Sequence, residues 1–241
     1  MHRSKSVFFS LIIAMALLAL VGIKASASGE WETGSVRDVR GFDSVSLDTS
    51  GELIITQGDR EGLEIEATPS DLRRIITEVR GGTLHIDRER GFSSLSFDRA
   101  TFRLTMKTIA GLETHSSGKI TVNNLRAGSL RIQISSSGGI SIDSLAADSL
   151  DAQISSSGSL AVAGKADQQN VRISSSGNYS AGKLASRTAN VEVSSSGDAT
   201  LRVSDSLEAR ISSSGEVRYY GNPPRVSSNT SSSGRLVKLG D

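Results

Sequence analysis

Apolar and polar residues alternate on both sides of a serine- and glycine-rich segment in the second half of the chain. One copy of this segment runs from Ile134 to Gly138 as Ile-Ser-Ser-Ser-Gly, and Ile140 and Ile142 follow it. Alternation with a period of two places one face of a strand in a core and the other face in solvent. We therefore predict that each unit consists of a strand, a serine–glycine corner, a second strand and a second turn.

The same unit returns every 18 to 20 residues as far as residue 239. Its marker glycines are Gly118, Gly138, Gly158, Gly177, Gly197, Gly215 and Gly234. The serines at the centres of the corners are Ser136, Ser156, Ser175, Ser195, Ser213 and Ser232. A fixed period of this length indicates stacked repeats, and these glycines and serines are the candidate structural residues of the corners.

Two geometries fit such a repeat. In an antiparallel meander the corners would be hairpin tips, whereas in a right-handed parallel β-helix, or β-solenoid, each unit would be one coil. The nearly constant length of the unit favours the solenoid, because a meander does not require strands of equal length. We therefore predict an all-β fold in which solenoid repeats over residues 114–241 follow a strand-rich N-terminal part. The predicted internal ladder of this solenoid consists of Ile134, Ile154, Ile173, Val193 and Ile211.

Two further predictions concern the corners, and one concerns the C-terminal end. Each corner glycine is expected at a positive φ, which a side chain would oppose. Stacked strands place equivalent residues about 4.8 Å apart, so the serine hydroxyls are expected to form a ladder of hydrogen bonds. Near the C-terminus, Pro223, Pro224 and Lys238 are residues of the types that protect an exposed strand edge.

Residues 36–113 carry strand patterns but do not keep the repeat, and we expect residues 36–239 to form one continuous domain. A degenerate corner is predicted at residues 49–51, which read Thr-Ser-Gly, and a hairpin at Gly81-Gly82.

The segment from Leu72 to Val79 allows two interpretations. It is either a helix capped by Ser70 or Asp71 or a strand, because residues 75–77 are β-branched. The charged, serine-rich residues 88–99 are typical of an exposed loop.

The chain begins with the pattern of an export signal. Arg3 and Lys5 precede an uncharged apolar run at residues 7–23, and residues 25–27, Ala-Ser-Ala, have the form of a leader-peptidase site. We predict that residues 1–27 are a cleaved signal peptide and that residues 28–35 are a flexible leader. The alternative is an uncleaved membrane anchor, since the apolar run approaches the length of a spanning helix. The expected location is the periplasm, the outer membrane or the cell exterior.

Charge and composition narrow the range of partners. The whole chain has 27 Lys plus Arg, 26 Asp plus Glu and no cysteine. Without residues 1–27, the chain keeps 24 basic and 26 acidic residues, a net charge of −2. This balance gives no reason to expect nucleic acid or an anionic membrane surface as a partner. Since no disulfide can form, stability must come from burial of side chains.

No constellation of catalytic or metal-binding residues stands out. Glycan cleavage needs two carboxyl groups about 5–9.5 Å apart, and the spacing of the candidate acids does not predict such a pair. These acids are Asp143, Asp148, Asp151 and Asp167. A nucleophilic serine needs a base, but His85 and His115, the histidines outside the signal, do not recur with the serines. Two histidines without cysteine do not make a common zinc site. We therefore predict no enzyme, no cofactor and no metal site.

Several local motifs are shared with a known family. They are Val-Arg-Gly-Phe-Asp-Ser-Val at residues 39–45, Ile-Ile-Thr-Gln-Gly at residues 54–58, Thr-Leu-His-Ile at residues 83–86 and, above all, the recurring hydrophobic-Ser-x-Ser-Gly corner. With these motifs the chain resembles the bacterial "putative auto-transporter adhesin, head GIN domain" family over roughly residues 36–239. Members of the family more often have Gly-Ser-Gly where this chain has Ser-Ser-Gly. The resemblance implies an exported, β-helix-like domain of the cell envelope and brings no catalytic residues with it.

The first hypothesis for function is a non-enzymatic cell-envelope protein, an adhesin or binding scaffold. Solenoids present long regular faces, and stacked Ser, Thr, Gln and Asn suit polar ligands such as glycans or the surface of another envelope protein. The alternatives are a polysaccharide-cleaving β-helix enzyme and a structural or assembly partner within the envelope.

Overall fold

The structure, a computed structural model, describes residues 33–89 and 100–241. The predicted signal peptide and most of the predicted loop at residues 88–99 therefore lie outside the described residues. The last residues of the predicted leader, 33–35, belong instead to the first strand. In this part of the chain, no helix is long and apolar enough to cross a membrane.

The described residues form sixteen strands and one short helix. The N-terminal elements are β1 (Thr33–Arg37), β2 (Ser44–Leu47), β3 (Glu52–Gln57), β4 (Gly62–Ala67), α1 (Pro69–Leu72), β5 (Ile75–Arg80), β6 (Thr83–Arg88), β7 (Thr101–Met106) and β8 (Gly111–Thr114). The repeats supply β9 (Lys119–Ile134), β10 (Gly139–Ile154), β11 (Ser159–Ile173), β12 (Asn178–Val193), β13 (Asp198–Ile211), β14 (Glu216–Tyr220), β15 (Arg225–Thr230) and β16 (Arg235–Gly240).

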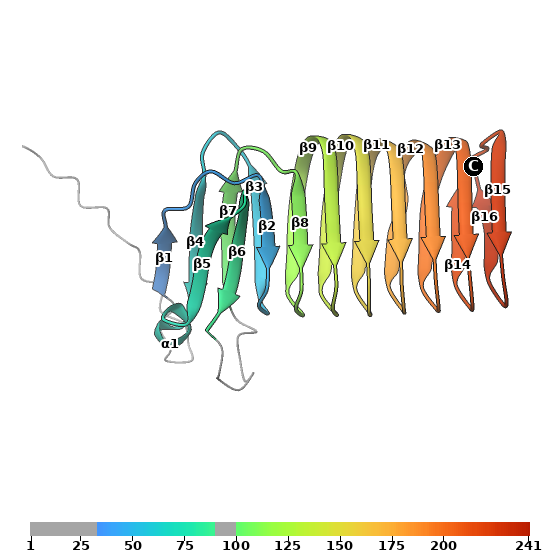
Figure 1. The fold of residues 1–241 in the computed structure, drawn as a ribbon. Helices are drawn as coiled ribbons and strands as arrows, with labels where there is room; N and C mark the ends of the chain where they lie inside the picture. Colours follow the sequence, from blue (N-terminus) through green and yellow to red (C-terminus); the bar gives the residue numbers. More distant parts are fainter. Residues whose placement is uncertain (1–32, 90–99) are drawn as a thin grey trace, which may run out of the picture.

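The long strands β9 to β13 stack in parallel, each one forming most of a coil (Figure 1). In the register of these strands, Ile154 lies opposite Ile134 on one side and Ile173 on the other. Pairing between positions one repeat apart excludes a meander, in which the strands flanking a corner would pair with each other. The predicted solenoid is therefore confirmed, and so is the internal ladder.

The interior of the coils is packed with the inward residues of each strand. The five ladder residues named above are at most 2% exposed. Tyr179 is also fully buried, and its hydroxyl donates to Gln169 Oε1 at 2.6 Å. The Gln169 amide donates to the hydroxyl of Ser186 at 2.6 Å. Burial raises the pKa of Tyr179 because the phenolate would lose its hydration, so the hydroxyl stays a neutral donor.

The N-terminal strands extend the same stack, but not in chain order. β2 pairs in parallel with β6 on one side and with β8 on the other, and β3 lies in the same way between β7 and β9. The predicted degenerate corner at residues 49–51 connects β2 to β3 in this stack. Beyond the β6–β7 layer the pairing becomes antiparallel, through β4, β1 and β5. These antiparallel strands close the N-terminal end of the solenoid (Figure 1).

The corner glycines are needed for a reason that the sequence did not indicate. In five corners the residue at positive φ is the central serine, with φ between 58° and 72°. These residues are Ser156, Ser175, Ser195, Ser213 and Ser232, while Ser136 does not share the conformation. None of the seven marker glycines has a positive φ, so that prediction is wrong. A Cβ at any of these glycines would instead lie between 2.3 and 2.9 Å from an atom of the preceding coil.

Backbone hydrogen bonds, rather than hydroxyls, join successive corners. The Ser196 amide donates to the Ser175 carbonyl at 3.2 Å, and equivalent bonds join the neighbouring corners. The Ser194 hydroxyl turns inward and donates to the carbonyl of Ile173 at 3.3 Å. Within the described residues no hydroxyl of one corner bonds to a hydroxyl of the next, so the predicted hydroxyl ladder is wrong. The corner backbone already satisfies its polar groups along the stack.

For residues 72–79 the strand interpretation is correct and the helix interpretation is wrong. The helix is only the short α1, which ends at Leu72, and its N-cap is Thr68 rather than Ser70 or Asp71. The β-branched residues that follow form β5, which pairs antiparallel with β6 through the predicted hairpin at Gly81-Gly82. Both of these glycines have a positive φ, as a two-residue hairpin turn requires.

The C-terminal coil consists of β15 and β16. β15 pairs with β13 on one side only, and all of its residues are exposed. Pro223 and Pro224 lie in the connection that leads into β15. The Lys238 ammonium, on β16, bonds to Asn222 and to Asp241. The residues predicted to protect an edge therefore do lie at the open end of the stack.

Candidate functional site

The predicted corner residues line one edge of the solenoid, and the structure brings no catalytic base to them. Backbone hydrogen bonds between successive corners stack these glycines and serines along this edge. The described hydrogen bonds of His85 and His115 lead to Asp48 and Ser46, not to any corner serine of the repeat. Within the described residues, neither histidine is therefore placed to activate a corner serine.

The two histidines form a cluster that the sequence did not predict. His115 Nδ1 lies 2.9 Å from Asp48 Oδ1, and His85 Nδ1 lies 3.3 Å from Asp48 Oδ2. The Ser46 hydroxyl donates to Asp48 at 2.8 Å and is fully buried. Because no substrate can reach it, Ser46 is not placed as a nucleophile. Among the described residues, no three His, Cys, Asp or Glu side chains are arranged to hold a metal ion.

The acids considered above for a glycan-cleaving pair lie in different surroundings. Asp167 lies 3.5 Å from the ammonium of Lys165 in an ion pair. Asp151 lies opposite Arg131 in the register of β10 and β9. Asp143 lines a hollow of a different part of the surface, described next. Within the described residues, Asp143, Asp151 and Asp167 therefore do not face one another as a pair.

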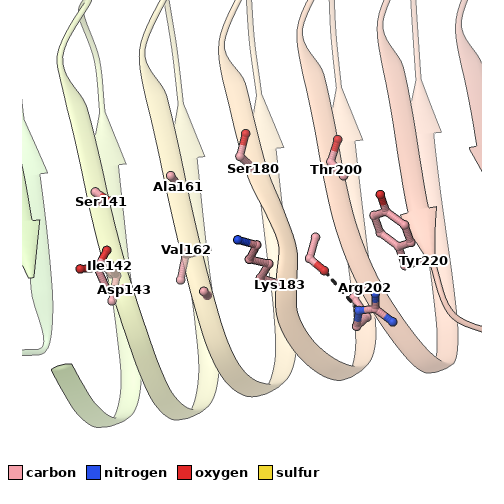
Figure 2. A pocket seen from close by; sticks show the side chains of 12 residues that line it. Ser141, Ile142, Asp143, Ala161, Val162, Ser180, Lys183, Thr200, Arg202 and Tyr220 are labelled. Carbon is pink, nitrogen blue, oxygen red and sulfur yellow. Dashed lines mark hydrogen bonds between the residues drawn. The ribbon is translucent and has the colours of Figure 1, made fainter. Parts of the chain in front are cut away.

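A groove of about 800 Å³ crosses the outer face of strands β10 to β14 (Figure 2). Two rows of outward side chains line it. The first row consists of Ser141, Ala161, Ser180 and Thr200, which are register partners from strand to strand. The second row consists of Asp143, Ala163, Lys183, Arg202 and Tyr220. The first row is small and mostly hydroxylic, whereas the second carries charge and the one aromatic ring of the lining.

The shape of the groove follows from unequal coil lengths. β12 has 16 residues, whereas β11 has 15 and β13 has 14. The extra residues of β12 form an irregularity, because Ala181 pairs with Leu201 and the next pair is Ala185 with Arg202. Lys183, within this bulge, is exposed. On β11 the outward side chains in the groove are those of alanines, so no long side chain rises from the sheet there.

Arg202 is held in place from two directions. Its guanidinium carbon lies 4.9 Å from the centre of the Tyr220 ring, a cation–π contact. Its Nε donates to the carbonyl of Gly182 at 3.2 Å, the bond drawn as a dashed line in Figure 2. The carbonyl that receives this bond belongs to the bulge of β12. Neither contact uses the two terminal nitrogens of the guanidinium, and these nitrogens have no hydrogen-bond partner among the described residues.

The groove contains two cations without a counter-charge. Neither Lys183 nor Arg202 forms an ion pair within the described residues. By contrast, two nearby cations are paired, Arg187 with Asp205 at 3.1 Å and Lys165 with Asp167. The Asp205 carboxyl is exposed, and hydrogen bonds from Ser204 and Arg187 lower its pKa. A second hollow, of about 450 Å³, lies beyond Arg202 and shares this residue with the groove.

Sequence reasoning missed the groove, although a signal was present. Lys183, Arg202 and Tyr220 follow one another at about one repeat length, and they replace the small residues Asp143 and Ala163 of the earlier coils. Positions one repeat apart stack, so large residues at such positions gather on one face. The irregular lengths of the coils concealed this correspondence.

The model of the family described as "Putative auto-transporter adhesin, head GIN domain" matches residues 41–223. A crystal structure of a "putative adhesin" from Bacteroides fragilis is similar, with a TM-score of 0.83 and 22% identity over 86% of this chain and 97% of that one. No curated protein matches the chain.

Two further crystal structures share the fold. A "putative adhesin" from Parabacteroides merdae has a TM-score of 0.71 and 18% identity, and a "Putative lipid binding protein" from Parabacteroides distasonis has a TM-score of 0.70 and 21% identity. Each covers 86% of this chain and 96% of the other. At these identities, the likeness establishes a common solenoid fold.

Proposed function

Because the chain belongs to the head GIN domain family of "putative auto-transporter adhesin" proteins, we propose that it is an exported, non-enzymatic envelope protein that binds a polar ligand. The observation that carries the proposal is the groove on β10 to β14. It combines a floor of stacked strands, a row of hydroxyls, an aromatic ring and two cations without an ion pair among the described residues. Binding sites typically combine a shaped surface with a few placed polar groups.

A glycan is the ligand that this lining fits best. Ser141 and Thr200 offer hydroxyls that make no hydrogen bond within the described residues, so they are free to exchange bonds with sugar hydroxyls. Tyr220 forms one wall and offers the ring that saccharide binding often uses alongside hydrogen bonds. An acyl chain, as the description of the P. distasonis protein would suggest, fits this hydroxylic and charged lining less well.

A glycan array tests the proposal. The protein is expressed with its N-terminal segment, recovered after export and applied to the array. We expect binding that is lost in Tyr220→Ala and kept in Ile76→Ala. The control residue Ile76 is 46% exposed and lies on β5, at the N-terminal end of the solenoid. Binding that survives Tyr220→Ala would contradict the assignment of the groove.

A reducing-sugar release assay on the glycans that bind separates this proposal from the enzymatic alternative. We expect no release above that of a heat-denatured control, because no pair of carboxyl groups faces the groove. Release that is abolished in Asp143→Asn would favour a polysaccharide-cleaving enzyme. Binding to a purified envelope protein with no binding to any glycan would favour an assembly partner.

Export is part of the same proposal. The Ala-Ser-Ala sequence at residues 25–27 supports cleavage after Ala27. N-terminal sequencing of the protein recovered from the periplasm or the medium should therefore begin at Ser28. Recovery of intact Met1 in the membrane fraction would indicate an uncleaved anchor instead.

A further inference from the structure

We infer that the groove on β10 to β14 selects a glycan that carries an isolated carboxylate, with Lys183 and Arg202 as the residues that bind the acid. The inference rests on the proposed function, since it assigns the ligand class of the same site. Three features carry it, namely the uncompensated charge, the geometry of Arg202 and the acids that surround the groove.

The positive charge of the groove is not neutralised by any ion pair within the described residues. The cations next to it are neutralised, Lys165 by Asp167 and Arg187 by Asp205. Lys183 and Arg202 lie on neighbouring strands, so two positive charges face the same hollow without a protein anion between them. Asp143, the acid of the lining, is on β10, about 10 Å from β12 at the usual spacing of strands. Asp143 forms no ion pair with Lys183 or Arg202, so the β12–β13 part of the groove keeps a positive charge that attracts an anion.

The guanidinium of Arg202 is preorganised for a carboxylate. Stacking on Tyr220 and the Nε bond to Gly182 fix its plane, which leaves the two terminal nitrogens for a ligand. A planar guanidinium fits a carboxylate through parallel charge-assisted bonds. Figure 2 shows Lys183 and Arg202 on adjacent strands along the same groove. The Lys183 ammonium is exposed and supplies further donors on the bulge of β12.

The surroundings favour one acidic group rather than a chain of them. Asp198 on β13 and Glu216 on β14 lie opposite each other. Asp198 is two residues before Thr200, so this pair belongs to the outward row next to the groove. Glu216 is already paired with Arg218 and Arg235, whereas Asp198 has no ion pair among the described residues. A nucleic acid or a densely charged polyanion that filled the groove would extend over the Asp198 carboxylate and be repelled by it. A saccharide with a single acidic sugar avoids this repulsion, because its neutral rings lie over the hydroxyls of Ser180 and Thr200.

The experiment compares each acidic oligosaccharide with its own neutral form. The probe is sialyllactose, together with an oligosaccharide carrying one glucuronic acid, and each is paired with its carboxylate methyl ester. Esterification removes the charge and keeps the sugar rings. Isothermal titration calorimetry at low salt should show the acid binding roughly tenfold to a hundredfold more tightly than the ester. The difference should shrink as salt is raised.

Two variants assign the effect to the groove. Lys183→Met and Arg202→Gln should each reduce the preference for the acid over the ester toward unity, with circular dichroism and melting temperature unchanged. Lys107→Met is the matched control, because Lys107 is exposed and lies just after β7, outside the groove. It should keep the preference of the wild-type protein.

The outcomes separate this inference from the proposed function. Acid and ester binding equally, both lost in Tyr220→Ala, would overturn the selection for a carboxylate and leave glycan binding in place. An absence of binding by any glycan in the paired series and on the array would overturn both. Binding to vesicles of phosphatidylglycerol that depends on Lys183, without binding of the acidic glycans, would also overturn the inference and would identify a lipid headgroup as the ligand.

Discussion

Replacing Gly177 with alanine should destabilise the solenoid, although the change adds only one methyl group. A Cβ at this position would lie 2.6 Å from Ile154 Cγ2 and 3.1 Å from Ile173 Cγ2, whereas ordinary contacts begin near 3.4 Å. Both isoleucines belong to the buried ladder, so neither can move without disturbing the coils on either side. Overpacking of this kind costs about 1–3 kcal/mol of unfolding free energy.

Shortening the Ile154 side chain tests whether its contact with the new methyl group causes the loss of stability. Ile154→Ala alone should cost roughly 2–5 kcal/mol, because it leaves a cavity in the ladder. In the double variant the 2.6 Å contact no longer exists, and the new methyl group of residue 177 occupies part of that cavity. The double variant should therefore be more stable than the sum of the two single changes by about 1–3 kcal/mol.

Ser175→Gly is the control within the same corner. Ser175 has a φ of 67°, so glycine relieves a left-handed conformation that costs roughly 1–2 kcal/mol. The gain is offset by the greater freedom of glycine in the unfolded chain, about 0.5–1 kcal/mol. We expect urea unfolding, followed by circular dichroism, to place this variant within about 1 kcal/mol of the wild type. A harmless Gly177→Ala, or strict additivity with Ile154→Ala, would refute the close-approach explanation of the corner glycines.

The other stability predictions use the same urea unfolding. Ile173→Ala, in the middle of the ladder, should cost roughly 2–5 kcal/mol, whereas Val226→Ala should cost much less because Val226 is 44% exposed; equal losses would argue against a stack with an open end. Thr114→Val should stabilise the protein by about 1–2 kcal/mol, since the Thr114 hydroxyl is buried without a partner; a loss of stability would mean that this hydroxyl is satisfied. Tyr179→Phe should cost about 1–3 kcal/mol because it leaves Gln169 Oε1 buried and unpaired, and an unchanged midpoint would show that water replaces the bond.

The repeat region was predictable because every coil carries the same information. Ile134, Ile154 and Ile173 occupy the same place in successive units, and only parallel stacking buries them all against one another. The role of the corner glycine was not predictable in the same way. The sequence shows that Gly177 recurs, but both a positive φ and a close approach explain such a glycine. Only the packing of Ile154 against the corner distinguishes them.

The N-terminal arrangement could not be derived from the pattern of residues. Alternation decides which side chains face the core, but it does not decide which strands become neighbours. β6 and β7 lie outside β2 and β3 although they come later in the chain. The cluster of Asp48 with His85 and His115 depends on this order, because the two histidines come from layers on opposite sides of β2. For this reason the pattern of residues did not indicate that the two histidines share one carboxylate.

The groove could be predicted from the sequence only in part, less fully than the repeats and more fully than the N-terminal arrangement. Arg202 and Tyr220 are register partners, and their spacing of nearly one repeat was visible in the sequence. Lys183 is different, because it lies in the bulge of β12 where the pairing with β13 is interrupted. A bulge shifts the register locally, and its position depends on how the backbone relaxes between coils of unequal length. The charge of the groove thus required the structure.

The measurement that tests the central claim most directly is a map of the ligand contact on the protein. Backbone amide chemical shifts of the labelled protein are recorded during titration with the acidic oligosaccharide that binds best. Binding in the groove predicts that the largest changes occur at Ala161, Lys183, Arg202 and Tyr220, and that the amides of the N-terminal strands β1 and β5 do not change. Changes concentrated at the serine–glycine corners, or at the exposed C-terminal strand β15, would contradict the assignment of the groove as the binding site.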